Sequence, residues 1–160
     1  MVVSNTSPLN YLVLIEEIDV LPRLYERVVI PQSVCEELQA AETPEAVRTW
    51  ILSPPDWLEI SSETGSMDSD LMGLHAGESD AISLALHLQA GALIIDERRG
   101  RSEAAKRELK VIGTIGVLAF AHECGLLNLS HVIVRLERTT FHLSPRLVTS
   151  VLQKYENTLE

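Results

Sequence analysis

Four polar side chains occupy positions where an α/β protein collects its reactive groups. Asn5 and Asp96 each follow an apolar segment that is typical of a strand, and Glu37 and Glu78 lie in helices that follow strands. Strands that run in parallel end at a common edge of their sheet, so we expect all four side chains at that edge. Carboxylates crowded together repel one another unless a cation is bound, and a site with only oxygen ligands indicates Mg²⁺ or Mn²⁺.

Helical spacing indicates which acids point inward. In the segment PQSVCEEL (31–38), Glu37 falls on the shoulder of the apolar face, whereas Glu36 faces solvent. In HAGESDAISLALHLQ (75–89), Glu78 falls inside the apolar arc and Asp80 lies on its polar edge. We therefore expect Glu78 to be a ligand, and Asp80 to contribute directly or through a water.

The two strand-end residues also have a structural interpretation. Asn and Ser cap helices, so Ser7 would be the cap of the next helix and Pro8 its first residue. Asp96 would then cap the helix that follows it, or pair with one of the arginines directly after it.

The acids in the two helices also have structural interpretations that do not involve a metal. Glu37 is only partly exposed on its helix, and an ion pair with an arginine would offset the cost of burying its charge. Acids in a first helical turn complement the helix dipole, which suits Asp80 better than Glu78.

Charge is distributed unevenly along the chain. The net charge is −10, which argues against a protein that simply coats nucleic acid. Residues 1–97 contain seventeen acidic and three basic residues, whereas residues 98–160 contain six acidic and ten basic ones. Six of those basic residues lie between positions 98 and 110. We expect Arg98, Arg99 and Arg101 to bind the phosphate backbone of a substrate beside the acidic site.

Composition indicates one soluble globular domain in the cytoplasm. The chain has 160 residues, of which 46% are hydrophobic and 22% charged. Its longest apolar run, 115–121, is too short to span a membrane, and the first residues lack the pattern of a secretory signal. Cys35 and Cys124 match no zinc or redox spacing, so we expect two small buried thiols in a reducing compartment.

Strand-like and helical segments alternate, which predicts an α/β fold with a mostly parallel sheet. The expected strands are 2–4, 28–30, 58–60, 92–95 and 111–112. The expected helices are 8–15, 31–40, 42–53, 77–89 with Gly91 as its end signal, a charged helix to about 109, 116–123 and 144–155. A further segment, 131–136, lies in the tail. We expect a single domain over 1–160, with 130–160 as a C-terminal extension packed on it.

Several segments resemble the PIN-domain superfamily, over essentially the whole chain. The matching segments are VVSNTSPL, IPQSVCEEL, GESDAISLA, LIIDERRGR and VIGTIGVL, and the tail segment TTFHLSP resembles a branch catalogued mainly as predicted nucleic-acid-binding proteins. The glycines of VIGTIGV do not have the spacing of a dinucleotide-binding fingerprint. The resemblance implies a three-layer α/β/α domain whose acidic cleft binds a divalent metal and cleaves RNA phosphodiesters.

The resemblance also implies roles for individual residues. The family's first acid falls on Asn5, the helix acid on Glu37, the next on Glu78 or Asp80, and the strand acid on Asp96. This branch often has Asn at the first position, which removes one negative charge from the metal site. The implied catalytic residues are thus Glu37, Glu78 and Asp96, which hold Mg²⁺ or Mn²⁺ together with Asp80 and Asn5. Ser7 is expected to contact the substrate.

Many similar proteins are VapC-like toxins of toxin–antitoxin pairs, which implies an RNA substrate, an antitoxin partner and a homodimer. We expect the apolar stretch Leu9–Leu14 to be exposed and to support such contacts. One alternative is a catalytically weak PIN-like module that binds RNA or a protein, because Asn5 weakens the metal site. Another is a binder of small nucleotides, although the chain has no glycine-rich phosphate loop.

Overall fold

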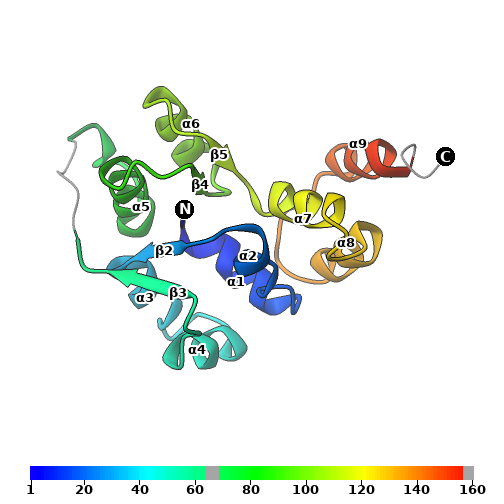
Figure 1. Cartoon of the computed structure of the whole chain (residues 1–160), viewed down its shortest axis with the longest axis horizontal. Coiled ribbons are helices and arrows are strands. Elements are labelled where there is room, and N and C mark those ends of the chain that lie inside the picture. Colours follow the sequence, from blue (N-terminus) through cyan, green and yellow to red (C-terminus); the bar gives the residue numbers. More distant parts are fainter. Residues whose placement is uncertain (64–68, 157–160) are drawn as a thin grey trace. The chain divides into compact units, whose positions relative to one another are not determined.

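A five-stranded sheet organises the first of the two units into which the chain divides, residues 1–114 and 115–160. The structure is a computed structural model that describes residues 1–63 and 69–156. All strands pair in parallel, in the order β3-β2-β1-β4-β5 (Figure 1). They are β1 (Val2–Ser4), β2 (Val28–Pro31), β3 (Leu58–Ser61), β4 (Ala92–Ile94) and β5 (Val111–Ile112). The predicted α/β fold with a parallel sheet flanked by helices is confirmed.

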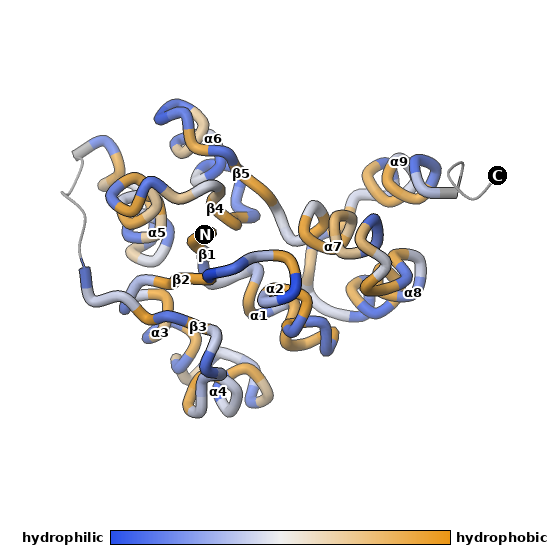
Figure 2. The backbone as a smooth tube through the Cα atoms, in the orientation of Figure 1, coloured by the Kyte–Doolittle hydropathy of each residue, from blue (hydrophilic) through white to orange (hydrophobic). Residues whose placement is uncertain are grey.

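The three central strands of the sheet, β1, β2 and β4, are buried on both faces. Val3 lies opposite Val29 and Leu93 in the neighbouring strands. These three side chains form one apolar cluster with residues of α5 (Ala76–His87) and α6 (Arg98–Lys106). The alternate strand residues Val2 and Val28 are buried as well, on the other face. Strands covered on both faces require uninterrupted apolar segments, and Figure 2 shows hydrophobic colour along the strands and on the helices beside them.

Two of the remaining helices of this unit follow strands directly. α1 (Thr6–Leu14) begins two residues after β1, and α3 (Gln32–Leu38) begins directly after β2, so both start at the carboxyl edge of the sheet. The helix expected over 42–53 is shorter than predicted: it is α4 (Glu45–Leu52). Two elements were not predicted: the short helix α2 (Val20–Leu24) and the 3₁₀ helix η1 (Ser69–Leu71). Part of the polar loop expected after β3, residues 64–68, lies outside the described residues.

The prediction that Gly91 ends the helix before β4 is wrong. α5 ends at His87, and Gln89 takes the left-handed conformation (φ 51°) that closes the helix. The Ala90 N–H then donates to the Ala85 carbonyl. Gly91 serves the sheet instead, because its N–H donates to the Met1 carbonyl (3.0 Å) at the start of β4.

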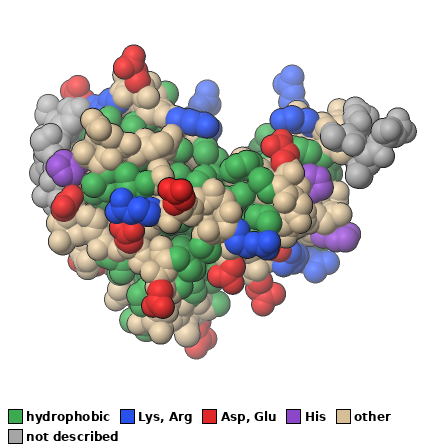
Figure 3. Space-filling model, viewed as in Figure 1, with side chains coloured by type: hydrophobic (Ala, Val, Ile, Leu, Met, Phe, Trp, Pro, Cys, Tyr) green, Lys and Arg blue, Asp and Glu red, His purple; other side chains and the backbone are tan. Residues whose placement is uncertain are grey.

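Two burial predictions are also wrong. Leu9 and Leu12 are fully buried, because α1 packs against α3 and α4, so the stretch Leu9–Leu14 is not an exposed apolar patch. Cys35 is buried as predicted, but Cys124 is exposed; both are free thiols. Large apolar side chains are exposed elsewhere, among them Leu52 and Met72. On the face drawn in Figure 3, apolar side chains reach the surface between charged ones.

The second unit is helical in its described part. It contains α7 (Thr114–Glu123), which starts at the last residue of the first unit, α8 (Leu129–Glu137) and α9 (Pro145–Glu156). The predicted segment 131–136 lies within α8, which buries Leu129, Val132, Ile133 and Leu136 at helical spacing. The arrangement of a single domain with a packed extension stays a prediction. In the described part of the chain, no helix has the length and apolarity needed to cross a membrane.

Tyr155 fastens α9 to α7 within this unit. Its hydroxyl donates to Glu123 Oε1 (2.6 Å), and its ring meets His122 edge-on with 5.1 Å between ring centroids. The hydrogen bond to the Glu123 carboxylate, with partial burial, raises the pKa of Tyr155 to about 12. The value in the unfolded chain is about 10, so this contact stabilises the fold fully below pH ~10 and is lost as the pH rises through the folded value.

A tyrosinate absorbance titration should therefore show one phenol that ionises near pH 12. In Tyr155→Phe that late step should disappear, and in Glu123→Gln it should move toward the ordinary tyrosine pKa, because the carboxylate that favours the protonated phenol is gone. An unchanged late step in Tyr155→Phe would contradict the assignment.

Candidate functional site

Residues 5–7, which are the N-cap and the first two residues of α1, form a turn after β1 whose three side chains bind three carboxylates. Each donor of residues 5–7 reaches a different acid. The pairs are Asn5 Nδ2 to Glu97 Oε2 (3.2 Å), Thr6 Oγ1 to Glu37 Oε2 (2.5 Å) and Ser7 Oγ to Asp96 Oδ2 (3.3 Å). Acids that are 31 to 92 residues away in the sequence therefore meet at one turn.

This turn lies at the point where the sheet changes direction. The Asn5 N–H donates to the Ile94 carbonyl (2.9 Å), which places the turn beside the end of β4. The chain leaves β1 toward β2 on one side and returns as β4 on the other, so β1 and β4 border the topological switch point. Open parallel sheets bind ligands in the crevice beyond the strand ends at such a point.

Glu37 is seated on the first turn of α5. Besides the Thr6 hydroxyl, the Gly77 N–H donates to Glu37 Oε1 (2.9 Å). The partners seen for this half-buried carboxylate are thus neutral donors rather than the arginine of the alternative interpretation. A Cβ at position 77 would lie 2.5 Å from Glu37 Oε2, so only glycine leaves room for the carboxylate here.

Gly77→Ala is expected to move the Glu37 carboxylate and to weaken Mn²⁺ binding about tenfold, the lower end of the range for lost positioning contacts at metal sites. Stability should hardly change, because the displaced atoms are the end of a flexible side chain and Ala favours the helix. Titration calorimetry and thermal melting measure the two effects.

Gly91→Ala is the matched control for this change, because its new Cβ would meet nothing closer than 3.4 Å. Shortening the acid in Gly77→Ala/Glu37→Asp should recover part of the binding. Wild-type affinity in the single variant Gly77→Ala would show that Glu37 does not depend on this position.

Asp96 is fixed by residues from two elements. Thr114, a fully buried residue at the start of α7, donates to Asp96 Oδ1 from its N–H and to Oδ2 from its hydroxyl, both at 2.7 Å. Asp96 therefore helps to cap α7, not the next helix α6 as the structural alternative supposed. Its carboxylate remains half-buried at the end of β4.

Glu78 and Glu97 bring further negative charge to the same place. The Glu78 side chain is buried, with 6% exposed, and its Cδ lies 3.8 Å from the position of a Cβ at Gly100 in α6. Partial burial of the carboxyl raises the pKa of Glu97, and the negative charges of Glu78 and Asp96 raise it further. The hydrogen bond from Asn5 acts in the opposite direction.

Asn5 does not act as a capping side chain. It occupies the N-cap position of α1, two residues before the predicted cap Ser7, but its side chain makes no capping hydrogen bond. The residue is 2% exposed, its amide nitrogen donates to Glu97, and its Oδ1 has no hydrogen-bond partner among the described residues. A buried oxygen without a partner is costly, and a bound cation would satisfy it.

The donor set fits a hard divalent cation bound by few protein ligands. Within residues 1–63 and 69–156, no three His, Cys, Asp or Glu side chains are arranged to hold a metal ion together. Mg²⁺ requires less than that, because it usually binds one or two carboxylates together with waters and phosphate oxygens. Asp96, the buried Glu78 and the unpaired Asn5 oxygen offer this chemistry, whereas Asp80 is only half-buried.

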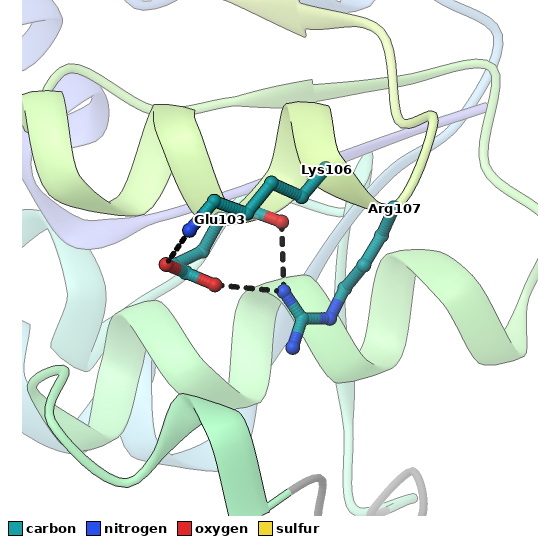
Figure 4. Close-up of polar contacts among 3 residues, drawn as sticks. All are labelled: Glu103, Lys106 and Arg107. Atoms are coloured by element: carbon teal, nitrogen blue, oxygen red, sulfur yellow. Dashed lines mark hydrogen bonds and ion pairs between the residues drawn. The ribbon is translucent and has the colours of Figure 1, made fainter.

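The predicted substrate-binding arginines differ in their availability. Arg98 and Arg99 are exposed in the first turn of α6, although the Arg99 guanidinium lies over Gly73. Arg101 is half-buried and donates from a terminal nitrogen to the Ile95 carbonyl (2.9 Å), so it supports the loop after β4. Two further cations of this basic segment, Lys106 and Arg107, bind the Glu103 carboxylate at 2.8 and 3.0 Å (Figure 4).

Sequence reasoning missed four residues of this site: Thr6, Gly77, Glu97 and Thr114. Glu97 had one available signal, since it follows Asp96 directly and could have been weighed as a second acid at the strand end. The other three belong to ordinary helix-start segments whose types occur in any turn.

A family model described as PIN domain, DUF3368, matches residues 1–157 of the chain. The match includes both units and every site residue described above. No curated protein and no solved structure matches the sequence.

Proposed function

Since the chain belongs to the PIN domain family, whose members are typically nucleases, we propose that it is a metal-dependent endoribonuclease that hydrolyses RNA phosphodiesters. One observation supports this proposal above the others: Glu37, Asp96 and Glu97 converge on the turn of residues 5–7 at the switch point of the sheet. Metal-dependent hydrolysis of a phosphodiester needs concentrated negative charge to hold a cation and an adjacent place for the phosphate.

In this proposal Glu37, Glu78 and Asp96 hold Mg²⁺ or Mn²⁺, Asn5 offers its neutral oxygen, and Asp80 assists directly or through a water. The metal would lower the pKa of a bound water and offset charge on the phosphate. The donors around the acids have positioning roles. Thr6 and the Gly77 N–H orient Glu37, and the two donors of Thr114 orient Asp96, which keeps the carboxylates in place without neutralising them.

The substrate would be held beside the acids by Arg98 and Arg99, with Ser7 near Asp96. Arg98→Ala/Arg99→Ala is expected to weaken binding of single-stranded RNA and to reduce the salt dependence of binding, log K against log[salt], by about 1.4 in slope, since each phosphate contact on a single strand contributes about 0.7. Fluorescence anisotropy at several salt concentrations measures this slope.

Lys106→Ala/Lys110→Ala removes the same charge from exposed positions of the same basic segment and is the matched control. Its slope should stay within about 0.3 of the wild type, because the loss of general attraction is not the loss of a phosphate contact. Equal slopes for the two double variants would show that Arg98 and Arg99 do not contact the RNA phosphates.

RNA cleavage by the purified full chain tests the proposed function. Cleavage of a structured RNA should occur with Mn²⁺ or Mg²⁺ and stop when EDTA is added. RNA binding without cleavage would favour the alternative, a catalytically weak RNA-binding module. That alternative has its own support, because the neutral Asn5 and the lack of a three-acid metal group in the described residues both point to a weak metal site.

The proposal extends to a toxin of a toxin–antitoxin pair that forms a homodimer and is inhibited by an antitoxin protein. Its support is the resemblance of the sequence segments given above and membership in the PIN domain family. Growth inhibition on expression that is absent for a cleavage-deficient variant would support the toxin role. A monomeric mass by light scattering at high concentration would contradict the homodimer.

A further inference from the structure

We propose that Glu97 is part of the metal site and provides the negative charge that Asn5 does not carry, so that the two residues work as a matched pair. This inference rests on the proposed metal-dependent function and adds a ligand to it. It also explains why an amide stands where the family resemblance places the first acid.

The two ends of the Asn5 amide have different surroundings. Its side chain is almost completely buried, and its amide nitrogen donates to Glu97 Oε2 at 3.2 Å. The other end of the amide, Oδ1, is buried without a partner among the described residues. Asn5 thus holds the Glu97 carboxylate with one atom and offers a free oxygen with the other.

Glu97 is directed toward the site rather than toward its own helix. It occupies the N-cap position of α6, yet its side chain makes no capping hydrogen bond there. Its carboxylate lies against Asn5 instead and is close enough to Glu78 and Asp96 for their charges to act on it. The negative charges of Glu78 and Asp96 thus act on the Glu97 carboxylate, which Asn5 binds, and a cation bound by one or two of these carboxylates with waters and the unpaired Asn5 oxygen would relieve the repulsion.

An acid at position 5 would conflict with this arrangement when no metal is bound. An aspartate has no N–H to donate, and its carboxylate would stand about as close to Glu97 as the amide does now, with like charges in contact. The amide avoids this repulsion, and Glu97 supplies the negative charge that an acid at position 5 would have brought. Exchanging the two side-chain types should therefore preserve the site. The exchanged protein would carry an acid at position 5 and an amide at position 97.

Calorimetric titration of the full chain with Mn²⁺ alone tests the pair. Glu97→Gln should weaken Mn²⁺ binding at least tenfold, whereas the exchanged variant Asn5→Asp/Glu97→Gln should return to within threefold of the wild type. Glu42→Gln removes one carboxylate from an exposed position and should leave the affinity unchanged. Metal-free melting adds a second readout: Asn5→Asp should lower the melting temperature, and adding Glu97→Gln should restore it.

The outcomes separate this inference from the function on which it rests. Mn²⁺ binding that Asp96→Asn weakens but Glu97→Gln leaves intact would overturn the pairing and keep the proposed site. Absence of any Mn²⁺ binding by the wild type would overturn both. If Glu97→Gln weakened binding but the exchanged variant did not recover it, the matched pair would be wrong.

Discussion

Replacing Asp96 with asparagine is expected to abolish Mn²⁺-dependent RNA cleavage and to weaken Mn²⁺ binding more than about a hundredfold, or about 2.8 kcal/mol. Asp96 stands at the end of β4, and three donated hydrogen bonds hold its two oxygens. The substitution removes the charge but keeps most of these bonds. The asparagine oxygen can accept from the Thr114 N–H, and its amide can donate to the Thr114 hydroxyl, which both donates and accepts.

Because those bonds remain, Asp96→Asn should weaken Mn²⁺ binding and cleavage without lowering the stability of the fold. Asp56→Asn, at an exposed position, removes the same charge and serves as the control for calorimetry, cleavage and melting. Equal Mn²⁺ affinity for the wild type and Asp96→Asn would refute the assignment of Asp96 as a ligand.

The change Asn5→Asp is expected to have opposite effects with and without metal. It should tighten Mn²⁺ binding by roughly tenfold, about 1.4 kcal/mol, because a charged oxygen replaces a neutral one at the site. Without metal it should destabilise the protein by about 2 kcal/mol, because a hydrogen bond to the Glu97 carboxylate is replaced by a like charge. That loss corresponds to a drop of about 4 to 8 °C in melting temperature for a chain of this size.

Melting curves with and without Mn²⁺ measure both effects in one experiment, since the metal-induced rise should be larger for Asn5→Asp than for the wild type. Asn10→Asp adds the same charge to α1 at a half-buried position away from the turn and is the control. If Asn5 were only a capping residue, asparagine and aspartate would be nearly equivalent at position 5, and neither effect would occur. An unchanged Mn²⁺ affinity would assign Asn5 the role of an ordinary turn residue.

Much of this protein could be predicted from local patterns in the sequence. Uninterrupted apolar segments such as ALI predicted buried parallel strands, and alternation with helices predicted the fold class. Helical spacing correctly placed Glu36 in solvent, Glu37 half-buried and Glu78 inside. These features follow from the geometry of a single strand or helix, which neighbouring residues determine.

The tertiary structure decided which groups meet. The hydrogen-bond partner of Asn5, Glu97, is 92 residues away in the sequence. Thr114 rather than an arginine binds Asp96. Glu37 accepts a hydrogen bond from the N–H of Gly77 in another helix. Leu9 and Leu12 became core residues because α3 and α4 cover their helix. No local pattern contains these pairings: they follow from the strand order β3-β2-β1-β4-β5, which brings the ends of β1 and β4 together, and from packing that leaves room at Gly77 for one particular carboxylate.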